Sequence, residues 1–392
     1  MDSDAFGPRS PGRLVPIQTG EGPCHAFVPN PLAPDLVFDR ALVNSLGDAE
    51  RALGELASEG RHLANPHLLI RPFMTKEAQL SSLIEGTQAT IEEVYEVQAG
   101  QLQLDGMSPP QVRSEVREVL NYILALETAL ARVETLPLSL RLIRETHAVL
   151  LRGVRGQEQT PGESRTSQNF IGAPGSAILE ATYVPPPANE VMGCLDILEK
   201  YIHATSDLRS LVRIALIHYQ FEAIHPFRDG NGRLGRMLIS LLLQEYGLLP
   251  HPLLYLSAYF ESNRKAYYDL LLGVSQQGAW EAWVRFFLDG VALQAAAAVS
   301  IAQKLRDLRN EWRDQVSRAR ASANLLRVID ALFATPYVTV GDVQRLLEVT
   351  DAAARYSVDK LVKAGILEPV GSSNYRRRYR ATAVIRILTE AP

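Results

Sequence analysis

The chain has 392 residues, of which 46% are hydrophobic and 21% charged, and its formal net charge is −4. This length is enough for roughly two or three domains with large cores, and the composition is that of an ordinary globular protein. The small net charge gives no global indication of nucleic-acid binding. The only cysteines, Cys24 and Cys194, are far apart in the sequence. They exclude a cysteine-based zinc cage and fit a reducing compartment.

The sequence carries no recognisable secretion or membrane signal. The N-terminal residues, M-D-S-D-A-F-G-P-R-S, lack an apolar signal core. The strongly apolar run Met237–Leu243 contains a serine and is far too short to cross a membrane. We therefore expect a cytoplasmic protein that does not enter a membrane.

The N-terminal region is predicted to hold an arm and two helices. Residues 1–35 are rich in proline and glycine, which predicts an extended arm with little regular structure. Helical periodicity then runs from about Leu42 to Leu56, between two loop-like stretches. A second helix is predicted over Lys76–Glu85, because Gly86 stands in the usual position after a helix C-terminus.

The following stretch is predicted to hold three more helices and a hairpin. Thr90, three residues before Glu93, predicts a capping box at the start of the first of these helices. The other two are expected over Pro110–Arg132 and Leu136–Leu151. After a glycine-rich loop, Ile178–Val184 has β-branched and aromatic residues, and three prolines prevent further pairing. A short exposed β-hairpin is expected there.

The stretch I-H-P-F-R-D-G-N-G-R-L-G-R separates two strongly apolar helical segments. Pro226 disfavours helical geometry at His225, so the first helix is expected to end there. A buried second helix is expected to begin at the turn Asp229–Asn231. Free backbone N–H groups and the positive end of that helix make an anion site, and the glycines let the backbone approach a phosphate closely.

Side chains around this turn suit phosphoryl chemistry. Arg233 and Arg236 lie on one face of the second helix, so both can reach the same bound anion. Asp229 is a hard oxygen ligand placed to hold Mg²⁺ beside phosphates. His225 can accept a proton from an attacking hydroxyl. Each residue alone has an ordinary structural explanation, but the combination at this spacing favours metal-assisted transfer of a phosphorus-centred group to an alcohol.

This stretch resembles the signature of the Fic family, H-x-F-x-(D/E)-G-N-G-R-x-x-R. Every fixed position is matched, by His225, Phe227, Asp229, Gly230, Asn231, Gly232, Arg233 and Arg236. The resemblance implies a mainly α fold, with a Fic helical core and a β-hairpin flap. It also implies a nucleotidyltransferase that moves AMP from ATP to a Ser, Thr or Tyr hydroxyl of a target protein or of itself.

The resemblance assigns a role to each part of the motif. His225 would deprotonate the target hydroxyl, Asp229 would bind Mg²⁺, and Phe227 would be a buried anchor for the loop. Arg236 would pair with the γ-phosphate of ATP. The nucleotide would be held by Asp229, Gly230, Asn231, Gly232, Arg233, Leu234, Gly235 and Arg236.

A further resemblance lies upstream, in the segment S-S-L-I-E-G. Ser81, Glu85 and Gly86 match the inhibitory motif of the family, (S/T)-x-x-x-E-(G/N), in the class whose inhibitory helix, here residues 76–86, is N-terminal. A carboxylate paired with Arg236 takes the partner that a γ-phosphate needs, and it puts negative charge where the triphosphate must lie. ATP would then bind only in a non-productive pose.

The resemblance also implies two further parts of the nucleotide pocket. Residues 178–188 would be the flap, on which a target segment docks by strand addition, with Thr182 and Tyr183 over the nucleotide. Tyr267 and Tyr268 match a tyrosine pair that lines the adenine and ribose pocket in related proteins, and stacking on a purine is physically sound. A plain surface hairpin and ordinary core packing are the respective alternatives.

The C-terminal part is predicted to be a separate module. An amphipathic helix over Trp280–Leu288 would close the core, and the alanine- and arginine-rich Gln294–Arg320 predicts a long connecting helix. Three helices, Asn324–Phe333, Val340–Leu347 and Ala352–Ala364, are followed by a two-stranded ribbon. This order resembles a winged helix-turn-helix.

The charge of the C-terminal module leaves its partner open. Residues 321–392 hold ten Lys or Arg and seven Asp or Glu, and the ribbon concentrates Arg376, Arg377, Arg378 and Arg380. In a DNA-binding role these arginines would contact phosphates while the third helix reads bases. The modest charge makes protein interaction or homodimerisation equally plausible.

The sequence thus predicts three regions: a Fic-type N-terminal region over 1–110, a catalytic core over 111–300, and a linker helix with a winged-helix module over 301–392. The expected activity is Mg²⁺- and ATP-dependent adenylylation of a target protein, restrained by Glu85. One alternative keeps the site but removes AMP from targets, with Glu85 orienting a water. The other alternative is a transcriptional regulator that binds DNA through its C-terminal module.

Overall fold

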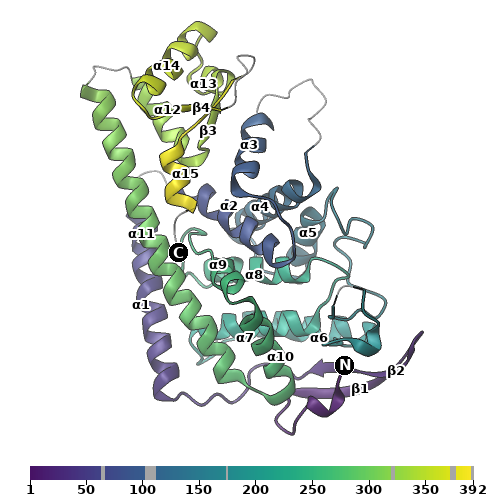
Figure 1. Cartoon of the computed structure of the whole chain (residues 1–392). Coiled ribbons are helices and arrows are strands. Elements are labelled where there is room, and N and C mark those ends of the chain that lie inside the picture. Colours follow the sequence, from purple (N-terminus) through teal and green to yellow (C-terminus); the bar gives the residue numbers. More distant parts are fainter. Residues whose placement is uncertain (63–66, 102–111, 174, 319–322, 371–376, 390–392) are drawn as a thin grey trace.

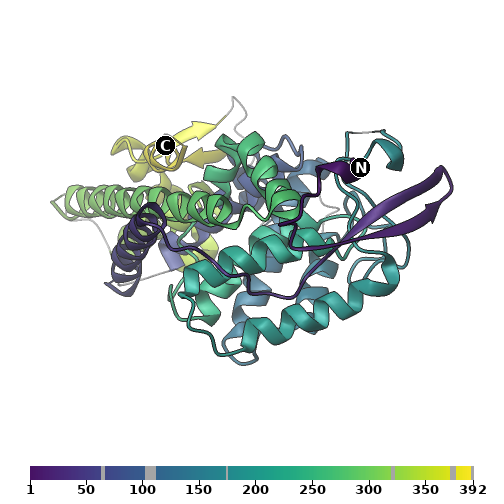
Figure 2. The same cartoon turned by 90° about the horizontal axis from the view of Figure 1, so that it is seen from below.

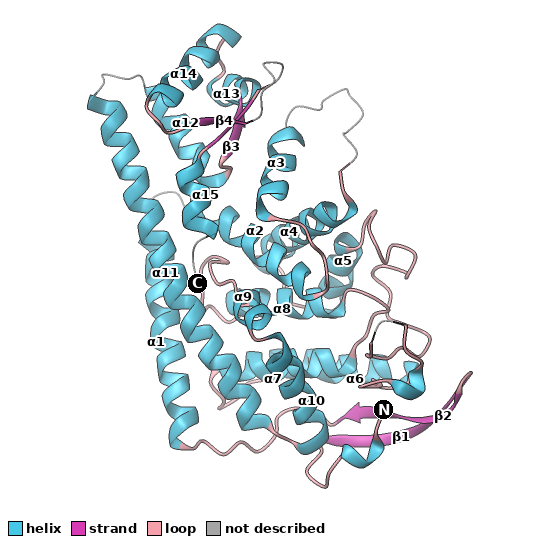
Figure 3. Cartoon of the chain, in the orientation of Figure 1, coloured by secondary structure: helices cyan, strands magenta, loops and turns pink. Residues whose placement is uncertain are grey.

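The structure is a computed structural model that describes residues 1–62, 67–101, 112–173, 175–318, 323–370 and 377–389. Helices dominate the fold, and small antiparallel sheets lie at its two ends (Figures 1 and 3). The predicted mainly α fold is therefore confirmed.

The chain starts with a β-hairpin, after a short 3₁₀ turn over Ser3–Ala5. Strands β1 (Gly12–Thr19) and β2 (Gly22–Pro29) pair antiparallel over their whole length, and the hairpin projects from the helical body (Figure 2). The prediction of an arm with little regular structure is wrong. Each strand has an outer edge with no neighbouring strand in its sheet, where proline is tolerated, and Phe27 is buried in the main core.

Helices α1 (Arg40–His62) and α11 (Trp280–Arg318) pack side by side along one flank (Figure 1). The two helices predicted over residues 280–320 are one continuous helix, because no proline stands between them and the single glycine there, Gly290, is tolerated inside a helix. By length and composition α11 could cross a membrane, but 56% of its apolar window is buried inside the protein. This burial is typical of a core helix.

Four helices form the upper part of the body in Figure 1: α2 (His67–Ile84), α3 (Ile91–Gln101), α4 (Ser114–Val133) and α5 (Leu140–Leu150). Helix α2 starts earlier than predicted and contains Pro72. A proline inside a helix removes a backbone hydrogen bond, so the sequence suggested a loop there. The predicted capping box at the start of α3 is present.

The centre of the molecule is a buried helical pair. Helices α7 (Ser210–Ile224) and α8 (Asn231–Glu245) lie at the middle of the core, and nearly every residue of α7 is buried. Around them lie α6 (Ala188–His203), α9 (Ser257–Ser262) and α10 (Arg264–Gln277). The helix break predicted at Pro226 is confirmed, and it positions the turn between α7 and α8.

The C-terminal module contains the three predicted helices, α12 (Ala323–Ala334), α13 (Val340–Leu347) and α14 (Asp351–Lys363). Strands β3 (Tyr337–Thr339), β4 (Glu368–Val370) and β5 (Arg378–Arg380) form one sheet in the order β3-β5-β4. Strand β3 and the final helix α15 (Thr382–Thr389) were not predicted. The order of elements is compatible with the winged-helix prediction.

Candidate active site

The turn between α7 and α8 is shaped by two residues with left-handed backbone. His225 caps α7 with a φ of 49°, and its N–H donates to the Phe221 carbonyl at 3.0 Å. Gly230 caps α8 with a φ of 77°. A Cβ at Gly230 would lie 3.3 Å from Leu151 and 3.4 Å from His147, so glycine suits both the conformation and the space. The first N–H groups of α8 therefore face the turn as a potential anion site.

The loop is fixed around Phe227, which is buried as expected of an anchor. The Asn231 side chain accepts from the Phe227 N–H and donates to the Phe227 carbonyl, both at 2.8 Å. Asn169 donates to the same carbonyl at 2.9 Å. The side-chain amide of Asn231 is already hydrogen bonded to Phe227. We therefore expect Asn231 to contact a phosphate through its backbone N–H.

His147 on α5 supports the loop from below and was not predicted. Its Nδ1 accepts from the Gly162 N–H at 2.8 Å, so Nε2 carries the hydrogen and donates to the Asp229 carbonyl at 2.9 Å. Its ring stacks on Phe227 with centroids 3.8 Å apart. Burial lowers the pKa of His147 to about 4, so the ring is neutral.

Arg165 is the second supporting residue that the sequence did not reveal. It lies in the glycine-rich loop after α5, where an arginine carries no recognisable signal. Its Nε donates to the His225 carbonyl at 2.9 Å, and its Nη2 donates to the Pro186 carbonyl at 2.5 Å. Burial lowers the pKa of Arg165 to about 10, so the guanidinium stays charged at neutral pH.

His225 is suited to accept a proton. Burial, and next the positive charge of Arg165, lower the pKa of His225 to about 4. The imidazole is therefore neutral at physiological pH. Its Nδ1 atom is buried, which leaves Nε2 as the nitrogen able to meet a substrate.

Arg233 is fully buried, with 0% exposure, near Asp229. Its Nη1 donates to Glu118 of α4 at 3.3 Å, and its Nη2 lies 3.5 Å from Oδ1 of Asp229. In the described part of the chain, Nε and Nη2 have no hydrogen-bond partner. Unused buried donors of this kind suit an oxyanion such as a phosphate.

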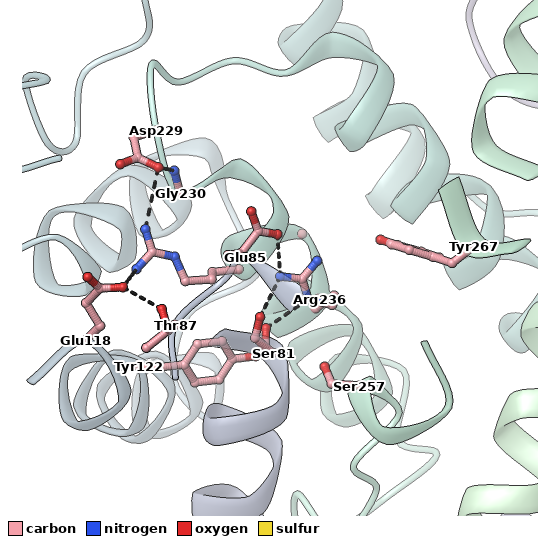
Figure 4. Close-up of polar contacts among 12 residues, drawn as sticks. Ser81, Glu85, Thr87, Glu118, Tyr122, Asp229, Gly230, Arg236, Ser257 and Tyr267 are labelled. Carbon is pink, nitrogen blue, oxygen red and sulfur yellow. Dashed lines mark hydrogen bonds and ion pairs between the residues drawn. The ribbon is translucent and has the colours of Figure 1, made fainter. Parts of the chain in front are cut away.

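The predicted contact between the inhibitory segment and Arg236 is present (Figure 4). Arg236 donates through Nη2 to Oε1 of Glu85 at 2.7 Å, and through Nε to Oγ of Ser81 at 2.9 Å. Gly86 follows directly after this carboxylate, in left-handed backbone. A Cβ on Gly232 would overlap Oε1 of Glu85, so this carboxylate lies directly against the first turn of α8.

Glu85 is ionised in this position. Burial would raise the pKa of its carboxyl, but the charge and the hydrogen bond of Arg236 outweigh burial and lower the pKa. The carboxylate thus competes directly with any anion for Arg236.

The flap differs from the prediction. Residues 178–180 form a 3₁₀ turn, and the paired strands of a hairpin are reduced to one bridge between Ile171 and Tyr183. The prolines at 185–187 lack N–H groups, so the pairing cannot continue. Tyr183 points into the core, where its hydroxyl donates to the Ala223 carbonyl at 2.9 Å, whereas Thr182 is exposed.

The tyrosine pair is also divided. Tyr267 is 1% exposed, its hydroxyl is hydrogen bonded to Nε2 of His218 at 2.8 Å, and its ring stacks on Phe260. It is a core residue, as the alternative interpretation expected. Tyr268 is 42% exposed and is the member of the pair that remains available to a ligand.

Asp229 is the one carboxylate at this site that would bind Mg²⁺. Among the described residues, no group of three or more His, Cys, Asp or Glu could hold a metal by itself. Mg²⁺ is commonly held by one or two carboxylates together with substrate phosphates. Asp229, part-exposed beside the α8 N-terminus, fits such a ligand.

Family models match the chain over two neighbouring segments. The Fic/DOC family N-terminal model matches residues 43–131, and the Fic/DOC family model matches residues 137–243. The chain belongs to the Fic/DOC family. The first segment of this Fic protein contains Ser81, Glu85 and Glu118, and the second contains the whole turn from His225 to Arg236.

Relatives and solved structures agree with this assignment. Proteins named protein adenylyltransferase Fic from Drosophila virilis and Drosophila melanogaster are 29% and 27% identical over 209 residues. That region is 53% of this Fic chain and 39% and 38% of those proteins, so the chain spans about two fifths of their length.

Two solved structures support the fold. A Fic family protein from Desulfovibrio desulfuricans matches with a TM-score of 0.56 at 21% identity, over 89% of this chain and 98% of that one. Fic-1 from C. elegans matches with a TM-score of 0.51 at 23% identity, over 68% and 74%.

Proposed function

We propose that this Fic protein is an adenylyltransferase that moves AMP from ATP to a hydroxyl of a target protein, with Mg²⁺. The observation that carries the proposal is a neutral His225 beside the N-terminus of α8, where Nε and Nη2 of the buried Arg233 have no hydrogen-bond partner among the described residues. The names of the relatives support it over the shared region. A cytoplasmic location and a homodimer are further proposals.

In the proposed reaction the target hydroxyl oxygen attacks the α-phosphorus of ATP, and the bond to pyrophosphate breaks. Nε2 of His225 accepts the hydroxyl proton, with the ring hydrogen on Nδ1. The first N–H groups of α8 and the free donors of Arg233 hold the phosphates. Mg²⁺ bound at Asp229 would neutralise phosphate charge.

The same geometry supports restraint by the N-terminal helix. Glu85 occupies Arg236 and lies against Gly232, so the carboxylate and a γ-phosphate compete for one guanidinium. Hydrogen bonds to charged groups contribute about 1.5–3 kcal/mol, which corresponds to a change of about ten- to a hundredfold in an equilibrium. Restraint of that size would keep the basal rate low.

Labelling with ATP tagged on the α-phosphate tests both the AMP transfer and its restraint by Glu85. We expect weak labelling by the wild type and an increase of at least about tenfold in Glu85→Gly, because Arg236 becomes free for the γ-phosphate. Glu85→Gly with His225→Ala should not label, because no group accepts the hydroxyl proton. A folded Glu85→Gly variant that binds ATP but transfers nothing would contradict the proposal.

Removal of AMP from a modified target is a second candidate. The ionised carboxylate of Glu85 lies against the first turn of α8, where it could orient a water toward a bound phosphoryl group. Release of AMP from a labelled protein should then be faster in the wild type than in Glu85→Gly. The opposite order would exclude this reaction.

The DNA-binding alternative is weakened by the ion pairs of the ribbon. Arg378 lies 3.0 Å from Glu96 of α3, and Arg380 lies 3.6 Å from Glu368. Two of the four arginines expected to meet phosphates therefore have carboxylate partners, and Arg376 lies outside the described residues. A gel shift without salt-sensitive binding would remove this candidate.

A further inference from the structure

A buried carboxylate outside the signature motif lies directly behind Arg233. Glu118 of α4 is 4% exposed. Its Oε2 accepts from Oγ1 of Thr87 at 2.8 Å and from Nη1 of Arg233 at 3.3 Å. Arg155 approaches the same oxygen at 3.8 Å from the surface. Figure 4 shows Glu118 and Thr87 together on one side of the site, with Asp229 across from them.

Glu118 is the hydrogen-bond partner that fixes the guanidinium of Arg233. Nη1 is bonded to Glu118, whereas Nε and Nη2 lack hydrogen-bond partners within the described ranges. A buried guanidinium without a counter-charge is strongly destabilising, so Glu118, together with Asp229 at 3.5 Å from Nη2, makes this burial tolerable. Glu118 also fixes the Nη1 end of the planar group, so a ligand would meet Nε and the Nη2 atom beside Asp229.

Thr87 connects this carboxylate to the inhibitory segment. Thr87 follows Glu85 by two residues, and its N–H donates to the Ser82 carbonyl at 3.1 Å, so it is tied to the end of α2. The segment 81–87 therefore contacts Arg236 directly, through Ser81 and Glu85. It reaches Arg233 indirectly, through the hydroxyl of Thr87 and then Glu118.

We propose that Glu118 is a positioning residue that orients Arg233 toward the phosphates of the nucleotide, and that Thr87 couples it to the inhibitory segment. The proposal rests on the proposed function only for the presence of a triphosphate at this site. It assigns a second role besides inhibition to residues 43–131, the segment that the N-terminal family model matches, because a residue of α4 completes the anion site of α8. A movement of segment 81–87 would then act on both motif arginines.

The affinity for ATP distinguishes positioning from simple electrostatics. Removing a negative charge beside an anion site should tighten ATP binding if charge alone matters. If Glu118 instead positions Arg233, removing its charge should weaken ATP binding, because Arg233 loses its fixed orientation. In the Glu85→Gly background with Mg²⁺, we expect Glu118→Gln to raise the Kd of ATP, measured by calorimetry, about tenfold. An unchanged or lower Kd would overturn the proposal.

A double-mutant cycle tests whether Glu118 acts through Arg233. In an Arg233→Ala background, Glu118→Gln should change the Kd less than about twofold. Additive effects would contradict the proposed route. Asp342→Asn is the control for loss of a paired carboxylate away from the site: the Asp342 side chain is 12% exposed and binds Thr339 and Arg345 in the C-terminal module, so its loss should leave the Kd unchanged.

Thr87 provides a variant that keeps the ion pair, in case Glu118→Gln does not fold. Thr87→Val removes the hydroxyl at nearly constant volume, and we expect a Kd about threefold higher, restored by Thr87→Ser. Equal Kd values for Thr87→Val and the parent would overturn the coupling. These experiments measure binding, so they remain interpretable if AMP transfer fails, and unchanged binding with normal transfer would reject only this inference.

Discussion

Arg165 shows how a single side chain outside the signature motif fixes the backbone at His225. One guanidinium binds the carbonyls of His225 and Pro186 and lies 3.4 Å from the Ile224 carbonyl. These carbonyls belong to the last turn of α7 and to the loop beside it, where no helical partner is available. The left-handed backbone of His225 therefore depends on a residue far away in the sequence.

Replacing Arg165 by methionine should affect both stability and activity. The substitution keeps an apolar stem but leaves buried carbonyls unpaired, at about 1–3 kcal/mol each. We expect a lower thermal midpoint, and labelling by Glu85→Gly reduced more than about tenfold even where the protein remains folded. Thermal unfolding and initial labelling rates measure the two effects.

Arg213 supplies the control for that experiment. It is likewise buried, and it donates to the carbonyls of Tyr201 and Ala204 at 2.8 and 2.9 Å, remote from the motif. Arg213→Met should lower stability by a similar amount without changing the rate at temperatures where the variant is folded. Equal loss of rate in both variants would mean that Arg165 acts only through stability.

At the scale of elements, α2 presents one row of polar side chains to two partners. Glu77, Ser81 and Glu85 are four residues apart, so they lie on one face of the helix. Glu77 accepts from the N–H of Ser257 at 3.1 Å, at the start of α9. Ser81 and Glu85 then reach Arg236. The helix is thus held at both ends of this row.

Ser81→Ala should relieve inhibition in part. The substitution removes the acceptor for Nε of Arg236, while Glu85 and the Ser81 carbonyl still bind the guanidinium. One hydrogen bond to a charged group contributes about 1.5–3 kcal/mol, and a retained carboxylate should limit the effect to about three- to tenfold more labelling. Ser82→Ala is the matched control, because the hydroxyl of Ser82 is buried and has no hydrogen-bond partner in the part of the chain that the structure describes. Equal effects of the two substitutions would refute a specific role for Ser81.

At the scale of the whole molecule, the C-terminal module lies against α2 and α3. Helix α12 packs on α2, β3 packs on α3, and Arg378 pairs with Glu96. Figure 1 shows the module above these helices and at the end of α11. The helix that carries Glu85 is therefore held by the catalytic core on one side and by the C-terminal module on the other.

A chain ending at residue 318 should label more strongly than the full chain. Without α12, α2 loses apolar packing, which contributes about 25 cal/mol per Å² of buried apolar surface, so Glu85 leaves Arg236 more readily. We expect an increase of several-fold, with a lower thermal midpoint, measured by labelling and by thermal unfolding. Adding Glu85→Gly should abolish the difference between the two lengths. Equal labelling by truncated and full chains would show that the module does not restrain α2.

Short-range signals in the sequence were enough for much of this description. The break at Pro226, the capping box of α3, the first three helices of the C-terminal module and the cluster from His225 to Arg236 all follow from residues close together in the chain. The pairing of Glu85 with Arg236 was also expected, because two separate family motifs pointed to one contact.

Tertiary packing decided the N-terminal hairpin, the orientation of two tyrosines and the residues that support the motif, because each of these depends on partners far away in the sequence. Residues 12–29 form a hairpin once Phe27 has a core to enter, and Tyr183 and Tyr267 turn inward because Ala223 and His218 offer hydrogen bonds there. No pattern near Arg165, His147 or Glu118 marks them. Each is recognisable only through burial beside the motif, since a buried polar group must find its partner wherever the fold provides one.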